Sequence, residues 1–236
     1  QSWLSPLLGF DGTHSKHPKY NGVILSLVGR NGNGQNVTLA TALVNVESES
    51  NITGFLDLCV EAGISFDENA VFCDRGNIRG AACQLYQAQG MRIELRFCTV
   101  HILRNVKRQF GCSGRNFENV VWKVQGAENE REYWVLVEAI RTKFDHPVTS
   151  YIQEINSERW TVHANMSSYL PVPPVDDSVP TLPLPMFGWR SMNFVESDNS
   201  AMLQNGIRNA TLLEIFMKCA SVAMERTSRR DIQAKQ

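Results

Sequence analysis

The sequence lacks long uninterrupted apolar runs and an excess of charge of either sign. Residues 23–28 are among its most apolar, yet they are only long enough for a strand, whereas a membrane-spanning helix needs about 20 apolar residues. Lys and Arg number 23 against 24 Asp and Glu, so the formal net charge is −1. These absences exclude a basic DNA-wrapping tail and a polyanionic disordered segment, and we expect no association with a membrane.

Cysteine is sparse, and several common catalytic motifs are missing. Six cysteines spread over 236 residues do not make the dense disulfide framework of small secreted domains, which favours reduced thiols in the cytosol or nucleus. The first residues lack the basic and apolar regions of a secretory signal, and we expect the chain to be a piece of a longer protein. No P-loop, no GxSxG nucleophile motif and no dinucleotide-binding fingerprint occurs.

The apolar material that is present suffices for a core and follows an α/β pattern. Hydrophobic residues make up 43% of the chain and charged residues 20%, as in ordinary globular domains of this length. A Gly/Asn turn at residues 31–34 joins two strand-length stretches, and helices are predicted at residues 50–63 and 77–89. The predicted strands are residues 7–10, 20–27, 37–46, 70–73 and 92–97. We therefore expect a mixed sheet whose first three strands are antiparallel.

From residue 101 onward the chain is predicted to be mainly helical. Apolar residues recur at three- and four-residue spacing, which predicts a helical annex. Six of the nine prolines lie in residues 170–185, where they predict an exposed loop or strap. Two helices are predicted after this strap, at residues 193–205 and 211–226. The predicted annex helices are residues 101–110, 117–125, 130–143 and 148–155.

Three acidic residues are candidates for a site. Asp11 and Asp74 each follow a predicted strand, and strand ends are where α/β folds assemble their sites. If the strands are neighbours, both carboxylates enter one crevice, where a hard divalent cation would hold them together. The alternative is that both are turn residues, because Asp and Gly are common in turns. Glu196 starts a predicted helix, where an acidic residue also simply opposes the helix dipole.

Five motifs together resemble the transposase domain of Mutator-like elements, which belongs with the ribonuclease H-like nucleases and transposases. The motifs are residues 10–14 (FDGTH), 19–22 (KYNG), 72–76 (FCDRG), 96–105 (RFCTVHILRN) and 193–199 (NFVESDN). The resemblance covers nearly the whole chain and implies a ribonuclease H-like mixed sheet flanked by helices, with a helical insertion before the last catalytic helix. It implies one catalytic domain over residues 1–236, with a core at 5–110 and 187–228 and a helical and proline-rich insertion at about 111–186.

The resemblance also implies a chemistry. Asp11, Asp74 and Glu196 match the family's catalytic acidic triad, which would bind two Mg²⁺ or Mn²⁺ ions and needs no covalent protein intermediate. The expected activity is that of a DNA transposase, which cuts transposon ends and joins 3′-hydroxyls to target DNA in the nucleus. Its expected partners are DNA and further copies of the chain, with DNA-recognition modules outside this chain. The family's frequent Trp in the first helix is missing from residues 48–54, which bears on packing more than on chemistry.

Other motif residues are candidates for accessory roles. Cys98 and His101 form a C-x-x-H pair, but this is only half of a zinc site, so we favour a role beside the active-site sheet. The alternative for His101 is a packed histidine at a helix start. His14 is expected either to bond a carboxylate or the scissile phosphate, or to face solvent. Asn193 and Asn199 belong to the same motif as the glutamate and are expected beside it.

A group of basic residues, which begins at the end of the fifth predicted strand and continues after it, is a candidate for DNA contact. Affinity for DNA comes largely from phosphate contacts, which such a stripe would supply. The alternative is a solvated helix face. The candidates are Arg96, Arg104, Lys107 and Arg108.

Two further functions stay open beside the transposase. A domesticated DNA-binding transcription regulator, as the plant far-red-response regulators are thought to be, would need the fold but not the acidic triad. Retention of all three acidic residues favours the enzyme. A plain nuclease such as ribonuclease H is less favoured, because the helical insertion and the NxxESxN motif resemble those of transposases.

Overall fold

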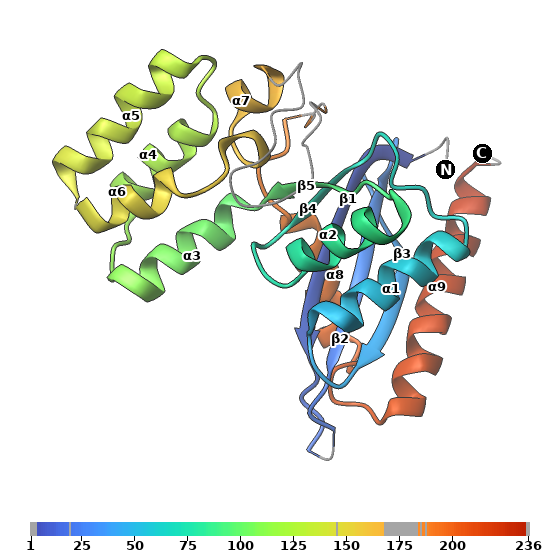
Figure 1. Cartoon of the computed structure of the whole chain (residues 1–236). Coiled ribbons are helices and arrows are strands. Elements are labelled where there is room, and N and C mark those ends of the chain that lie inside the picture. The colour runs from blue at the N-terminus through green and yellow to red at the C-terminus, as the bar shows by residue number, and fades with distance from the viewer. Residues whose placement is uncertain are drawn as a thin grey trace.

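A five-stranded sheet forms the centre of the molecule, with the strand order β3-β2-β1-β4-β5 (Figure 1). The strands are β1 (Leu4–His14), β2 (Val23–Asn31), β3 (Asn36–Val44), β4 (Ala70–Cys73) and β5 (Glu94–Phe97). This computed structural model describes residues 4–18, 20–144, 146–167, 184, 186 and 188–234.

The two halves of the sheet differ in strand direction. β1, β2 and β3 are antiparallel neighbours, and the turn between β2 and β3 is closed by the Gly34 N–H, which donates to the Asn31 carbonyl at 2.9 Å. Gly34 has a φ of +72°, which glycine adopts without steric cost. β4 is parallel to β1, and β5 is parallel to β4. The predicted mixed sheet with three antiparallel opening strands is confirmed.

The register between β1 and β4 decides where two of the acidic residues lie. Gly9 pairs with Phe72 in this parallel pair. Two residues further along, the same register places Asp11 level with Asp74, which directly follows β4. Asp11 thus lies inside β1, and the prediction that it follows the strand was wrong, because β1 continues to pair with β2 as far as His14.

Helices cover both faces of this sheet (Figure 1). On one face lie α1 (Glu49–Glu61) and α2 (Ile78–Gln89), and on the other lie α8 (Asn193–Gln204) and α9 (Leu212–Ala234). Each pair packs on its own group of buried apolar residues, so the chain forms a three-layer α/β arrangement.

Side-chain alternation along β1 assigns Asp11 to the face covered by α8. Leu8 and Phe10 pack in the core beneath α1 and α2. Gly9 points the other way, and a Cβ at this position would overlap Cγ2 of Val195 in α8. Because successive strand residues alternate between faces, Asp11 shares the α8 face with Gly9. The missing side chain at Gly9 lets α8 approach β1 closely.

The local sequence accounts for the ends of α1 and α2. Ser48 caps α1 by accepting a hydrogen bond from the Asn51 N–H at 3.2 Å. Gly90 ends α2 with a φ of +69°, the left-handed conformation that glycine favours at helix ends. The buried residues of α1 recur at helical spacing, at Ile52, Phe55, Leu56 and Cys59.

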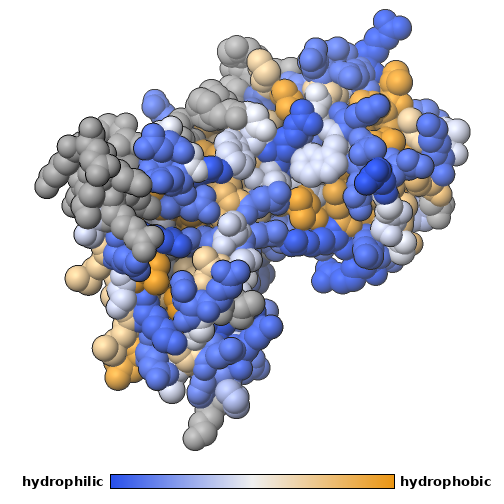
Figure 2. All heavy atoms as spheres, turned by 180° about the vertical axis from the view of Figure 1, so that it is seen from behind, coloured by the Kyte–Doolittle hydropathy of each residue, from blue (hydrophilic) through white to orange (hydrophobic). Residues whose placement is uncertain are grey.

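The remaining helices form an annex beside the sheet (Figure 1). They are α3 (Thr99–Phe110), α4 (Arg115–Gln125), α5 (Glu130–Lys143), α6 (His146–Gln153), η1 (Ser157–Arg159) and α7 (Val162–Ser167). Trp160, which directly follows η1, connects this part of the annex to the start of α3 by donating its indole N–H to Thr99 Oγ1 at 3.1 Å. Seen from behind, the molecule is hollowed between the sheet part and the annex, and hydrophilic side chains border the hollow (Figure 2). Helices α4 to α7 of this annex fall within the predicted insertion at about residues 111–186, and residues 168–183 of that insertion lie outside the described residues.

A buried polar network fixes α8 and α9 on the sheet. Asp198 in α8 accepts hydrogen bonds from Thr38 Oγ1 of β3 at 2.8 Å and from Arg226 Nη1 of α9 at 2.7 Å. Asn36 Nδ2 donates to the Phe194 carbonyl at 2.6 Å. Because Asp198 is buried, these bonds supply the partners that its charge needs.

Several predicted boundaries differ from those of the structure. β2 begins at Val23, three residues later than predicted, and the last helix continues to Ala234. The predicted proline-rich strap at residues 170–185 lies outside the described residues, apart from Leu184. Among the helices that the structure describes, none is both long and apolar enough to cross a membrane.

Candidate active site

Asp11 and Asp74 form the centre of an acidic cluster at the carboxyl end of β4. Asp74 Oδ1 accepts a hydrogen bond from the Gly76 N–H at 2.9 Å, which orients this carboxylate in the loop before α2. Burial is the main cause of a raised pKa at Asp11, which moves from its ordinary 3.8 to about 7. The nearby charge of Asp74 acts in the same direction, followed by those of Glu47 and Glu196. Asp11 therefore lies among mutually repelling carboxylates.

Glu47 is a fourth carboxylate of this cluster, and no sequence motif predicted it. It lies in the loop between β3 and α1, and a Cβ at Gly12 would overlap its Oε2. Burial raises the pKa of Glu47, and the charge of Asp74 adds to the effect. Gly12, directly after Asp11, is the one feature of the sequence that hints at Glu47. A glycine in a strand indicates that another group packs closely against the backbone, but it does not identify that group.

Glu196 lies in the first turn of α8 and faces α3. Both of its carboxylate oxygens accept hydrogen bonds from the Arg104 guanidinium: Nη1 to Oε1, and Nη2 to Oε2 at 3.1 Å. His101 Nε2 lies 3.6 Å from the same Oε1. This two-point pairing fixes the carboxylate geometrically as well as electrostatically. Glu196 is thus near the cluster but is held by α3.

Asn199 connects α8 directly to the cluster. Its Nδ2 donates to Asp11 Oδ2 at 2.7 Å, and the side chain is buried. Its Oδ1 is also buried, without a hydrogen-bond partner among the groups that the structure describes. The structure therefore places Asn199 against Asp11, and its predicted accessory role in the site stays a prediction. Asn193, the first residue of α8, is exposed.

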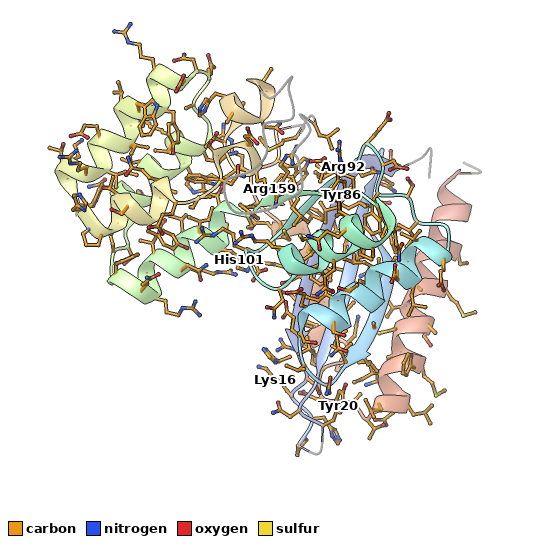
Figure 3. The ribbon with its side chains drawn as sticks, in the orientation of Figure 1. Lys16, Tyr20, Tyr86, Arg92, His101 and Arg159 are labelled. Carbon is orange, nitrogen blue, oxygen red and sulfur yellow. The ribbon has the colours of Figure 1, made fainter. Side chains whose placement is uncertain are left out.

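Cys98 and His101 take different places although they are three residues apart. Cys98 is buried, and its Sγ accepts a hydrogen bond from the Met192 N–H at 3.3 Å, which joins the start of α3 to the segment before α8. Burial raises the pKa of the Cys98 thiol. Burial lowers the pKa of His101, which projects from α3 at the junction of the annex and the sheet part (Figure 3). His101 thus lies near Glu196 and Cys98 is packed against the segment before α8, and an accessory role for the pair stays a prediction.

Two predicted site residues lie away from the acidic cluster. Arg96 is fully buried in β5 and lies 3.5 Å from Glu94, so the structure does not support its predicted contact with DNA. Burial lowers the pKa of Arg96 to about 10. His14 is exposed at the end of β1, three residues from Asp11, and an odd spacing in a strand turns the two side chains to opposite faces.

The other predicted DNA-contacting residues are exposed on α3. Arg104 pairs with Glu196, and Arg108 Nη2 donates to Asn105 Oδ1 at 3.2 Å. Lys107 is exposed on α3 between them in sequence. A phosphate-contacting role for these three residues stays a prediction.

The oxygen atoms of the cluster are chemically suited to bind a hard divalent cation. Carboxylate and amide oxygens are ligands of Mg²⁺ and Mn²⁺, and the buried Oδ1 of Asn199 lacks a described partner. Yet within the described part of the chain, no three His, Cys, Asp or Glu side chains are arranged to hold a metal ion. Glu196, one of the three predicted ligands, instead accepts hydrogen bonds from Arg104 through both of its carboxylate oxygens.

Comparison with known proteins gives distant structural likenesses. No protein-family model matches the chain, and no curated protein is similar to it. A chain of the simian T-cell lymphotropic virus intasome, in complex with the PP2A regulatory subunit B56 gamma, matches 52% of this chain at 12% identity and a TM-score of 0.30. The match spans about half, 49%, of the intasome chain.

The catalytic core of HTLV-2 integrase in complex with magnesium gives two further matches. Its dimeric form has 14% identity and a TM-score of 0.28, covering 52% of this chain and 86% of that chain. Its trimeric form has 16% identity and a TM-score of 0.26, covering 55% and 94%. Because these TM-scores are low, the ribonuclease H-like fold rests on the strand order, the strand directions and the helices on both faces described above.

Proposed function

We propose that this chain is the catalytic core of a DDE-type DNA transposase of the Mutator-like kind. Its reaction would be phosphodiester cleavage at transposon ends followed by transfer of the 3′-hydroxyls to target DNA. One observation carries the proposal: β1, β4 and α8 bring Asp11, Asp74 and Glu196 to the same end of the sheet. The five sequence motifs support it independently.

The chain's own residues have distinct tasks in this proposal. Asp11 and Asp74 would hold Mg²⁺ or Mn²⁺, joined by Glu196 once it leaves Arg104. When bound, the two cations would activate the attacking water or 3′-hydroxyl and stabilise the leaving oxygen. Asn199 orients the Asp11 carboxylate through its 2.7 Å hydrogen bond. Accordingly, Asn199 is a positioning residue and the three carboxylates are the catalytic residues.

The proposal extends to the setting in which the chain would work. Its substrates would be transposon-end and target DNA, and it would act in the nucleus as a homo-oligomer. Recognition of the transposon ends would come from modules outside this chain. These points rest on the resemblance of the motifs.

Nicking of supercoiled DNA in Mn²⁺ tests the proposal. The wild-type chain is compared with Asp11→Asn, Asp74→Asn and Glu196→Gln, and each variant is expected to nick about 100-fold more slowly or worse, because a ligand of the metal is lost. Glu138→Gln is the matched control, since Glu138 is an exposed glutamate of α5 in the annex whose carboxylate lies 3.5 Å from the neighbouring Arg141. The control should nick at the wild-type rate.

A direct measurement of metal binding by calorimetry accompanies the nicking assay. If the wild type folds but neither binds Mn²⁺ nor nicks DNA, the enzyme proposal is wrong and the fold serves a regulator instead. If a ribonucleic acid–DNA hybrid is cleaved in preference to duplex DNA, the chain is a plain nuclease. Loss of nicking confined to the three triad variants supports the transposase core.

A further inference from the structure

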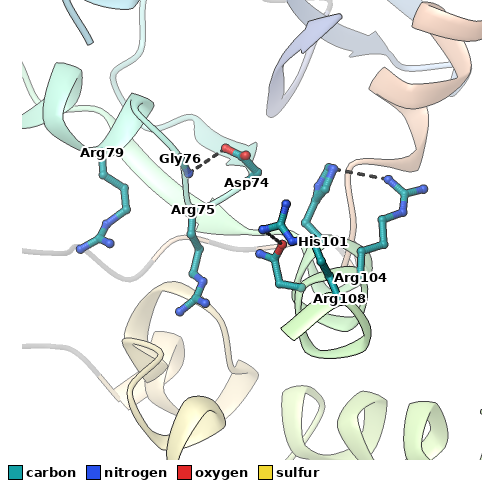
Figure 4. Close-up of a pocket in the computed structure, with 8 residues that line it drawn as sticks. Asp74, Arg75, Gly76, Arg79, His101, Arg104 and Arg108 are labelled. Atoms are coloured by element: carbon teal, nitrogen blue, oxygen red, sulfur yellow. Dashed lines mark hydrogen bonds between the residues drawn. The ribbon is translucent and has the colours of Figure 1, made fainter. Parts of the chain in front are cut away.

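A basic pocket adjoins the acidic cluster and shares Asp74 with it (Figure 4). Its volume is about 590 Å³. Asp74 is the single carboxylate among the described residues that line it. Four arginines also line it, namely Arg75, Arg79, Arg104 and Arg108. Their charges stand out in a chain whose formal net charge is −1.

The fold brings these arginines together from two separate segments. Arg75 directly follows Asp74, and Arg79 lies one helical turn later in the first turn of α2. Arg104 and Arg108 are four residues apart on α3 and therefore lie on one face of that helix. The pocket is thus the space between the start of α2 and one face of α3 (Figure 4).

Two of the guanidinium groups are held in place by neighbours. Arg75 Nη2 donates to the Tyr151 hydroxyl of α6, and its guanidinium lies 4.7 Å from the centre of that ring. Arg108 Nη2 donates to Asn105 Oδ1 at 3.2 Å. Guanidinium groups oriented in this way are suited to phosphate oxygens, which they bind through paired N–H donors.

We propose that this pocket binds backbone phosphates of the DNA strand that passes through the acidic cluster, next to the phosphate that reacts. The inference deepens the proposed function and rests on it. Asp74 lines the pocket and also belongs to the cluster, so a strand with one phosphate at the cluster places its neighbouring phosphates against the arginines. The overall charge gives no general attraction to DNA, so this local concentration of positive charge supplies it.

DNA binding without metal tests this inference separately from catalysis. A fluorescent 20-base-pair duplex is titrated with the 236-residue chain in EDTA at several salt concentrations. Arg79→Gln and Arg108→Gln are each expected to weaken binding about 3- to 10-fold and to lower the salt slope by about 0.9, the value for one lost phosphate contact. Arg131→Gln, an exposed arginine of α5 in the annex, is the control and should bind as the wild type does.

Charge-conserving variants separate phosphate binding from a structural role. Arg79→Lys and Arg108→Lys should keep the wild-type salt slope, because a lysine still neutralises a phosphate as a point charge. If the Lys variants lower the salt slope as much as the Gln variants do, the arginines act through packing and the inference is wrong. Retained melting temperatures show that each variant is folded.

Two outcomes separate this inference from the proposed function. If the triad variants lose nicking while the Gln variants bind DNA like the wild type, the inference fails and the transposase proposal stands. If no metal-dependent nicking occurs and the salt slopes still fall, the pocket binds DNA and the catalytic proposal fails. Inorganic tripolyphosphate is the competitor: if it binds as tightly as the duplex and the Gln variants weaken only its binding, the pocket is a site for a free polyphosphate instead.

Discussion

The surroundings of Asp11 disfavour the ionised form of its carboxyl group. Because burial and neighbouring carboxylates raise its pKa to about 7, the folded chain binds a proton that the unfolded chain has lost between about pH 4 and pH 7. The free energy of unfolding therefore falls as pH rises through this range, and the loss is complete above pH 7. Residues that serve a metal site commonly carry such a cost in the metal-free protein.

Replacing Asp11 by Asn removes this charge and should stabilise the metal-free chain. Asp11→Asn is expected to raise the free energy of unfolding at pH 8 by about 2–3 kcal/mol more than at pH 5, since the folded chain keeps the Asp11 proton over about two pH units of this range and one unit corresponds to about 1.4 kcal/mol. Urea unfolding in EDTA at both pH values measures the difference. Glu138→Gln, at an exposed site, should show no such pH dependence. An equal effect of Asp11→Asn at both pH values would show that Asp11 is not held against its charge.

At the residue scale, the candidate site residues that could be predicted from the sequence are those that stand in a local motif. Asp11, Asp74 and Glu196 each stand in a recognisable motif, and Asn199 was expected near the glutamate. Glu47 carries no such mark, because its approach to Gly12 joins a strand to a distant loop and depends on three-dimensional packing.

For the arginine pocket, too, the sequence predicted only some of the residues that come together in the fold. Arg104 and Arg108 were candidates because they follow a strand in a basic run, whereas Arg75 and Arg79 were not considered. Only the packing of α2 beside α3 brings the two pairs together. Arg96 belongs to the same basic run, but it lies within β5 and is fully buried.

At the element scale, Gly9 of β1 determines how closely α8 can approach the sheet. A Cβ at Gly9 would overlap Val195 Cγ2 and lie 2.7 Å from Phe194 Cζ. Gly9→Ala should therefore push α8 from β1 and destabilise the fold by about 1–3 kcal/mol, the usual cost of overpacking. Since α8 carries Glu196 and Asn199, DNA nicking should fall as well. Urea unfolding and the nicking assay measure the two effects.

A second glycine provides the control for this substitution. Gly54 lies inside α1, and a Cβ there would have no neighbouring heavy atom within 4 Å. Gly54→Ala should leave nicking unchanged and stabilise the chain by up to about 1 kcal/mol, because alanine favours the helix. Equal unfolding energies for the two variants would mean that Gly9 does not set the approach of α8.

Element types were predicted better than element ends. Hydrophobic periodicity identified the five strands and the helices around them, because burial of one face imposes that periodicity. The Asp11-Gly12 pair looked like a turn, yet pairing with β2 extends β1 through it to His14. Tertiary pairing thus overrides a local turn preference, and it cannot be read from the dipeptide alone.

At the scale of the whole molecule, a net charge of −1 conceals two opposite local charges that meet at Asp74. Asp74 lies in the acidic cluster that includes Asp11, Glu47 and Glu196, and it also lines the arginine pocket. Arg104 belongs to both, since it lines the pocket and holds the Glu196 carboxylate. On the proposed function, a DNA phosphate bound by Arg104 would compete with Glu196 for it and would free a predicted metal ligand.

Metal and DNA should therefore bind cooperatively, and Arg104 should carry part of the coupling. Calorimetric titration with Ca²⁺, which replaces Mg²⁺ to suppress cleavage, should give a Kd about 5- to 50-fold lower when a duplex is bound, with the same factor for DNA when metal is present. Arg104→Gln should bind Ca²⁺ more tightly than the wild type without DNA, because no guanidinium competes for Glu196, and should gain less from DNA. Arg131→Gln should keep the wild-type coupling. Equal coupling in the wild type and Arg104→Gln would show that Glu196 reaches the metal without displacement from Arg104.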